Sequence, residues 1–119
     1  MTPARFRTIA LSMPGAFESE HMAHPDFRVG EGAKARIFAS LTTKGDEEWG
    51  MVKLSPGEQA RFMKLNPGAF VPASGAWGRA GATMVLLGEI DQRTLRNAVI
   101  AAWRNTAPKE MVREMDGTS

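Results

Sequence analysis

The chain has 119 residues, of which 43% are hydrophobic and 24% are charged, as in soluble globular domains rather than disordered or membrane-embedded chains. It contains no cysteine, which excludes a disulfide scaffold, thiolate-bound metal centres and thiol catalysis. Fifteen Lys and Arg residues against thirteen Asp and Glu residues leave a net charge of +2, which by itself does not indicate a polyanionic partner.

The chain shows neither a membrane-spanning segment nor a secretory signal. No window approaches the run of about 18 apolar residues that a membrane-spanning helix requires. The apolar run after Arg7 is interrupted by Ser12 and Pro14, so it does not read as a secretory signal. We therefore expect a cytoplasmic protein without membrane contact.

The first predicted element is a helix that begins at Pro3. Thr2 is a suitable N-cap, and proline is well tolerated at the first helical position. Pro14-Gly15 ends the helix. The spacing of one buried helical face is met by four apolar residues: Phe6, Ile9, Ala10 and Met13.

Residues 18 to 54 have the pattern of a β-meander. Short runs rich in β-branched and aromatic residues, among them Arg36 to Leu41, alternate with turn sequences such as Lys44-Gly45-Asp46. A further strand is expected over Trp49 to Leu54, with either Met51 or Val52 facing the core. The pattern predicts three or four antiparallel strands.

The second half predicts two helices and one strand. Ser55 and Glu58 form a capping box for a short helix that ends at Asn66-Pro67, and after a loop the segment Thr83 to Leu87 reads as a strand. Asp91 caps a long helix that ends at Ala107-Pro108. Its apolar face consists of Leu95, Ala98, Val99, Ala102 and Trp103.

These elements predict one α+β domain over residues 1–109. An antiparallel sheet of about five to six strands is expected to pack against the N- and C-terminal helices and the short middle helix. Residues 110–119 are polar and predict a frayed tail.

Few residues suggest catalysis or metal binding. His21 and His24 lie three positions apart in an extended segment, which places them on opposite faces of a strand. The acidic triplet Asp46-Glu47-Glu48 lies at a hairpin turn and is expected to be solvated. Because no nucleophile, base and orienting partner can be assigned, we expect no enzyme activity, no metal and no cofactor.

The segment Gly75 to Gly81 is the most distinctive in the chain. Its three glycines around Trp77 and Arg79 predict a tight, partly exposed loop. Trp77 either stacks on a ligand or base while Arg79 contacts a phosphate, or it covers the core with Arg79 over its ring.

Positive charge is concentrated in the second half. Residues 50–109 carry eight cations and three acids, whereas residues 110–119 carry a net charge of −2. On the last predicted helix, Arg93, Arg96 and Arg104 share the face opposite the apolar one. This face is either simply solvated or contacts phosphates.

Several segments, taken in order, resemble the MmcQ/YjbR family of small bacterial proteins. They are His24-Pro25-Asp26-Phe27-Arg28-Val29, Ile37-Phe38-Ala39, Met51-Val52-Lys53-Leu54, Trp77-Gly78-Arg79, Ala102-Trp103-Arg104 and Ala107-Pro108-Lys109. The resemblance implies a frataxin-like (CyaY-like) fold and DNA binding through a sheet surface with two wing-like hairpins. It does not imply an iron role, because the first predicted helix has no acidic ridge.

The leading hypothesis is therefore a non-enzymatic DNA-binding domain, monomeric or weakly dimeric. Its expected contacts are Lys53, Trp77, Arg79, Arg93, Arg96 and Arg104. Two alternatives stay open. One is a protein-interaction surface around exposed Ile100, and the other is a small-ligand pocket beneath the Gly75 to Gly81 segment.

Overall fold

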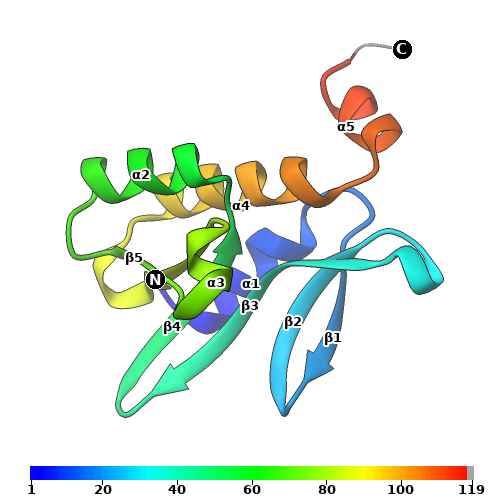
Figure 1. Cartoon of the computed structure of the whole chain (residues 1–119). Coiled ribbons are helices and arrows are strands. Elements are labelled where there is room, and N and C mark those ends of the chain that lie inside the picture. The colour runs from blue at the N-terminus through cyan, green and yellow to red at the C-terminus, as the bar shows by residue number, and fades with distance from the viewer. Residues whose placement is uncertain (118–119) are drawn as a thin grey trace.

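A six-stranded antiparallel sheet organises the molecule in the computed structural model, which describes residues 1–117 (Figure 1). Its order is β1-β2-β3-β4-β6-β5, so the first four strands form a meander and the last two exchange places. The strands are β1 Phe17–His21, β2 His24–Val29, β3 Arg36–Lys44, β4 Glu47–Lys53, β5 Phe70–Pro72 and β6 Ala82–Leu86. The predicted α+β class and the antiparallel sheet are confirmed.

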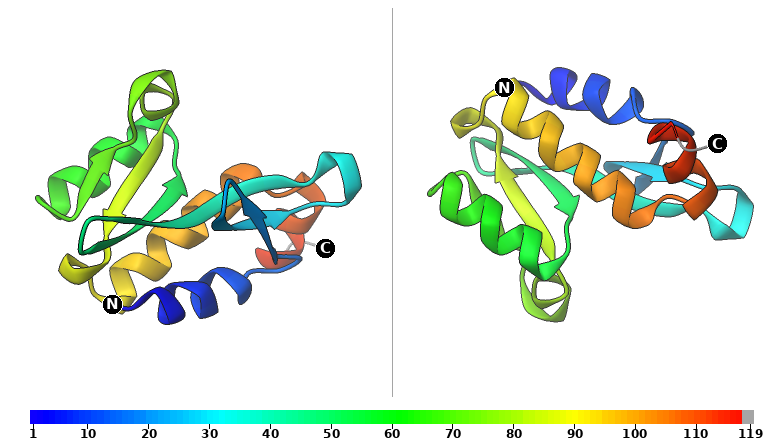
Figure 2. Two further views of the ribbon diagram at one scale, coloured as in Figure 1. Left: turned by 90° about the horizontal axis from the view of Figure 1, so that it is seen from below. Right: turned by 90° about the horizontal axis from the view of Figure 1, so that it is seen from above.

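Three helices form a layer on one face of the sheet. Helix α4 crosses β3 and β4, α1 lies beside α4, and α2 packs against β5 (Figures 1 and 2). The helices are α1 Pro3–Leu11, α2 Pro56–Leu65, α3 Gly75–Arg79, α4 Gln92–Thr106 and α5 Lys109–Met115.

The main core lies between this helical layer and the sheet. Phe6 of α1, Phe27 of β2, Phe38 of β3 and Trp103 of α4 are completely buried. The indole N–H of Trp103 donates to the carbonyl oxygen of Pro14 at 2.8 Å, so the one polar atom of this side chain is satisfied. The predicted apolar faces of α1 and α4 are therefore the faces that pack on the sheet.

Local side-chain bonds fix where the helices begin. The hydroxyl of Thr2 accepts from the backbone N–H of Arg5 at 3.1 Å, and Asp91 accepts from that of Thr94 at 2.7 Å. In α2 the capping box is complete, with Ser55 and Glu58 bonded to each other's backbone at 2.8 and 3.2 Å. All three predicted caps are confirmed.

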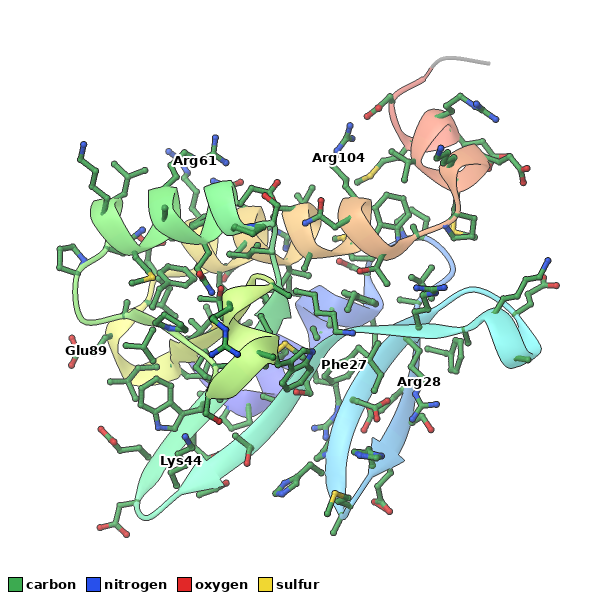
Figure 3. All side chains as sticks on the ribbon, in the orientation of Figure 1. Phe27, Arg28, Lys44, Arg61, Glu89 and Arg104 are labelled. Atoms are coloured by element: carbon green, nitrogen blue, oxygen red, sulfur yellow. The ribbon has the colours of Figure 1, made fainter. Side chains whose placement is uncertain are left out.

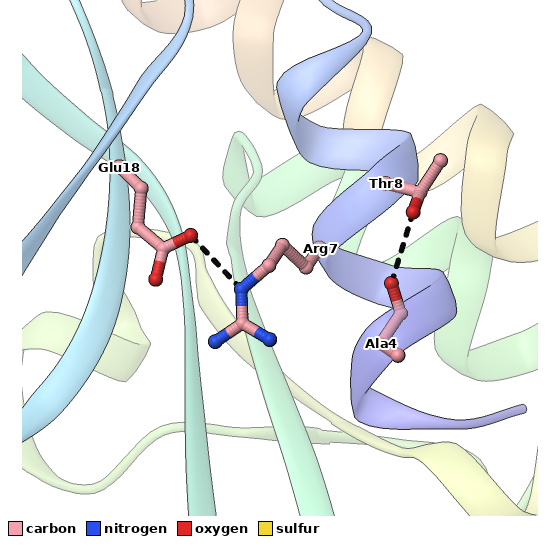
Figure 4. Close-up of polar contacts among 4 residues, drawn as sticks. All are labelled: Ala4, Arg7, Thr8 and Glu18. Atoms are coloured by element: carbon pink, nitrogen blue, oxygen red, sulfur yellow. Dashed lines mark hydrogen bonds and ion pairs between the residues drawn. The ribbon is translucent and has the colours of Figure 1, made fainter.

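Helix α1 is tied to the first hairpin by an ion pair. The Nε of Arg7 donates to the Oε1 of Glu18 on β1 at 2.9 Å, while the Thr8 hydroxyl bonds back to the Ala4 carbonyl (Figure 4). Because both charged side chains are partly exposed, this pair contributes at most about 1 kcal/mol. It positions the edge strand rather than stabilising the fold.

Three sequence-based expectations are wrong. Strand β5 falls where a loop is expected, and the Gly75 to Gly81 segment forms helix α3. Helix α5 occupies Lys109–Met115, so the expected frayed tail does not begin at residue 110. Residues 118 and 119 lie outside the part of the chain that the structure describes.

Candidate functional site

The face of the sheet opposite α1, α2 and α4 carries a row of side chains in register. Asp26 pairs with Ser40, Ser40 with Met51 and Met51 with Met84, across β2, β3, β4 and β6. Since side chains alternate along a strand, these four residues point away from the main core. We call this surface the open face.

A cleft of about 210 Å³ lies on the open face. Ile37, Met51 and Met84 of the sheet line it, together with Trp77 of α3 and the tip of the β1–β2 hairpin. The side chains that surround it are drawn in Figure 3. The cleft therefore has an apolar lining between a helix and a hairpin.

The acid beside the cleft is already neutralised. Asp26 is only 1% exposed, and both of its oxygens accept from the guanidinium of Arg28, at 2.8 and 3.1 Å. Arg28 lies on β2, where Figure 3 labels it. A bidentate pair of this kind leaves no free charge to attract a cation into the cleft.

Helix α3 is held in place by close backbone contacts. A Cβ at Gly78 would lie 1.7 Å from the carbonyl oxygen of Ala73, so only glycine allows this approach. The side-chain amide of Gln59 on α2 donates to the carbonyl oxygens of Gly78 and Ala82 at 3.0 and 3.1 Å. These contacts overcome the low helix propensity of the glycines and fix the position of Trp77.

Trp77 lines two hollows. One is the cleft, and the other is a hollow of about 180 Å³ that it lines together with Lys53 and Ala80. The Nζ of Lys53 lies 5.7 Å from the centroid of the Trp77 ring, and Trp77 is 50% exposed. The interpretation in which Trp77 covers the core beneath Arg79 is wrong, because the cation over its ring is Lys53.

Burial lowers the pKa of Lys53, and the charge of Arg36 lowers it further. The ammonium group therefore lies in a partly desolvated environment beside a second cation. Such a pair attracts an anion more strongly than an isolated surface lysine does, since an anion relieves the repulsion between the two cations.

The structure unites only part of the predicted contact set. Lys53 and Trp77 are in contact, and Arg79 is exposed at the end of the same helix α3. Arg93 and Arg96 are exposed on α4, and Arg96 lies nine residues before Asn105, whose amide donates to the carbonyl of Lys53. Nine helical residues span about 13 Å, so these arginines are separated from Lys53 along α4.

Arg104 is engaged by Asp116, the residue that follows α5. Its guanidinium donates two hydrogen bonds to the carboxylate of Asp116, one of them at 3.0 Å from Nη2 to Oδ2. These bonds, together with the charge of Arg104, lower the pKa of Asp116. The guanidinium of Arg104, a predicted phosphate contact, is therefore already paired with a carboxylate of the same chain.

The two histidines are direct neighbours across the first hairpin. His21 pairs with His24 because Met22 and Ala23 reverse the chain between them, so the expectation of opposite faces is wrong. Within residues 1–117 no group of three His, Cys, Asp or Glu side chains is placed to hold a metal ion.

Comparison with known proteins shows the family to which the chain belongs. The YjbR family model matches residues 11–105. The chain belongs to the YjbR family. The predicted resemblance is thus confirmed over most of the sequence, whereas no match is found among the curated proteins.

Solved structures support the fold of this YjbR-family chain. It is similar to Deinococcus radiodurans protein DR2400, which carries the DUF419 domain, with a TM-score of 0.71 at 17% identity, over 95% of this chain and 86% of that one. It is also similar to a Pseudomonas syringae protein, with a TM-score of 0.69 at 15% identity, over 89% of this chain and 99% of that one. In the described part of the chain, no helix is long and apolar enough to cross a membrane.

Some residues of the candidate site have little signal in the sequence. Met51 and Val52 are both buried, but Val52 belongs to the main core and Met51 to a small cluster beneath the open face. Because neighbouring residues of a strand point to opposite faces of the sheet, the sequence could have predicted that Met51 and Val52 are buried on different faces. The role of Gln59 depends on contacts with residues 19 to 24 positions away, which no local pattern reveals.

Glu58 makes the stability of this YjbR-family chain depend on pH. Burial raises its pKa, but hydrogen bonds from Asn105 and Ser55 and the charge of Arg61 outweigh burial and lower it. A carboxyl whose folded pKa is lowered stabilises the fold above its unfolded pKa, and this contribution is lost as the pH falls through the folded pKa.

We expect Glu58→Gln to destabilise the protein more at pH 7 than at about pH 3, because the stabilisation is lost as the pH falls through the folded pKa of Glu58 and the carboxyl becomes protonated in the folded protein. Urea unfolding at the two pH values measures this difference. Glu89→Gln, at an exposed glutamate, is the control and should change neither midpoint. An equal loss at both pH values would contradict the electrostatic role.

Proposed function

We propose that this YjbR-family chain binds single-stranded DNA, with one unpaired base stacked on Trp77 and an adjacent phosphate held by Lys53. The observation that carries the proposal is the half-exposed Trp77 ring with the Lys53 ammonium 5.7 Å from its centroid. Proteins that bind single strands combine aromatic stacking platforms with nearby cations in this way.

The geometry favours a single strand over a duplex. A base within a duplex is already stacked on both sides and cannot reach an indole without being unpaired, whereas an unpaired base has a free face. Trp77 is a single aromatic side chain on the five-residue helix α3, which is far shorter than a recognition helix that enters a major groove.

The hairpin tips are less suited to DNA than the surface around Trp77. Asp46, Glu47 and Glu48 are exposed at the β3–β4 turn, near the labelled Lys44 in Figure 3. Glu20 is exposed on β1. These carboxylates repel phosphates, so the contacts are assigned to Lys53, with Arg36 and Arg79 extending the positive surface.

The proposal involves binding alone. One copy of the chain is sufficient for it, and neither a metal, a cofactor nor a catalytic step is required. The cytoplasm is the proposed location, where the chain would meet DNA.

Lys53→Glu should weaken the binding of a fluorescent oligo-dT strand by about tenfold at low salt, because it replaces a phosphate contact with a repulsive charge. Fluorescence anisotropy at several salt concentrations measures the affinity and its salt dependence. The affinity of the original protein should fall as salt rises, and the duplex should bind more weakly than the single strand.

Lys44→Glu is a matched control. Lys44 also lies over a tryptophan, with its Nζ 5.9 Å from the centroid of Trp49, but it belongs to the acidic hairpin tip. The control should retain the affinity of the original protein. Equal losses in the two variants, or no binding of the single strand at low salt, would contradict the proposal.

A further inference from the structure

The cleft on the open face has features that binding to a DNA backbone does not use. Three methionine side chains, Met22, Met51 and Met84, line it together with the indole of Trp77. Lys53 does not line the cleft but lines the second hollow that Trp77 borders. The cleft is therefore distinct from the hollow that holds the cation.

The lining of the cleft selects an uncharged ligand. Asp26 is fully paired with Arg28, so no unpaired carboxylate calls for a cation. The floor consists of Ile37, Met51 and Met84, and an ion placed on it would lose its hydration without gaining a partner there. His21 and His24 line the hairpin side of the cleft, where an imidazole can form a hydrogen bond with a neutral ligand. Ser40 and Thr42 line the cleft as well and can bond a single hydroxyl.

The volume of the cleft limits the ligand to a small molecule. A dry apolar cavity of about 150 Å³ holds a benzene molecule, so about 210 Å³ is suited to one ring or to two fused rings. A larger molecule would extend beyond the cleft into solvent and gain little further burial.

The side chains favour an aromatic ring over an aliphatic one. Thioether sulfurs make favourable contacts with aromatic rings, and an indole stacks on a second ring with a further gain. A planar ring that enters beside Trp77 can make both kinds of contact, whereas an aliphatic ring of equal size makes neither.

The β1–β2 turn presents Met22 beside this cleft at a cost in backbone energy. Met22 and Ala23 have φ values of 51° and 67°, the left-handed conformation that glycine and asparagine normally occupy in a two-residue turn. Met22 is 80% exposed and yet is part of the lining. A flexible thioether held there can fold over a ring bound in the cleft.

We propose that the cleft binds a neutral aromatic molecule of one or two rings, stacked on Trp77 and enclosed by Met22, Met51 and Met84. This binding does not require DNA, and Lys53 is not among the residues that line the cleft.

The probe is 2-naphthol, titrated into protein whose methionine methyl groups carry ¹³C, with NMR as the readout. We expect ring-current shifts at Met22, Met51 and Met84, and no shifts at Met63 of α2 or Met115 of α5. Cyclohexanol, as the aliphatic control, should cause much smaller shifts. No shift with 2-naphthol, or shifts spread over all the methionines, would overturn the proposal.

Variants separate this site from the DNA site. Met84→Lys should weaken 2-naphthol binding by about tenfold by charging the floor, and Leu65→Lys, at a residue 69% exposed on α2, should leave it unchanged. Lys53→Glu should also leave it unchanged, whereas it weakens DNA binding. Loss of 2-naphthol binding in Lys53→Glu would overturn the separation, and retention in Met84→Lys would overturn the assigned cleft.

Discussion

Replacing Gly78 with alanine is expected to displace helix α3 and to lower the melting temperature by about 10 °C, which corresponds to a few kcal/mol in a domain of this size. The added Cβ would lie 1.7 Å from the Ala73 carbonyl oxygen and 2.7 Å from its carbon. Both are backbone atoms and cannot rotate away, so the helix itself must move. Thermal unfolding followed by circular dichroism measures the loss.

Gly57→Ala provides the matched control. Gly57 is also helical, but nothing lies within 4 Å of a Cβ built there. Alanine has the higher helix propensity, so this variant should be neutral or more stable by up to about 1 kcal/mol. An unchanged melting temperature in Gly78→Ala would contradict the close packing of α3.

The same variant connects the fold to the proposed sites. Because Trp77 precedes Gly78 in α3, displacement of the helix should weaken both DNA binding and 2-naphthol binding. Lys53→Glu, in contrast, should affect DNA alone. Both the proposed DNA binding and the proposed 2-naphthol binding therefore depend on the position of α3, which Gly78 and Gln59 set.

The elements that the sequence predicts well are those whose signals are local. Thr2, Ser55 and Asp91 lie within three residues of the backbone groups they cap, and a single apolar face identifies α1 and α4. Elements that depend on distant contacts are missed. Helix α3 contains two glycines and persists because α2 supplies Gln59, and the three residues of β5 form a strand only by pairing with β6.

In the candidate site, too, the features with local signals could be predicted and those that depend on distant contacts could not. Trp77 is recognisable in the sequence as an unusual residue among glycines, but its nearest cation in the chain, Arg79, is not the one over its ring. Lys53 comes from β4, which pairs with β6 and so brings residue 53 beside the segment that precedes residue 82. The frataxin-like relationship stays a prediction, as does any role of Ile100, which is half-buried on α4.

Replacing Trp77 with alanine is expected to weaken the binding of single-stranded DNA by about 5- to 150-fold, the range that corresponds to loss of one base–aromatic stack. Since the side chain is 50% exposed, the melting temperature should change far less than in Gly78→Ala. Anisotropy with the oligo-dT strand and thermal unfolding of the same sample measure the two effects separately.

Trp77→Phe tests whether Trp77→Ala weakens DNA binding because a stacked base is lost. Phenylalanine keeps a flat ring for a base and for the Lys53 ammonium, although with less area, so it should restore part of the affinity that alanine loses. Leu65→Ala removes a similarly exposed apolar side chain from α2 and should have no effect. If phenylalanine and alanine are equally weak, Trp77 acts through packing of α3 rather than through a stacked base, and the proposed DNA contact is wrong.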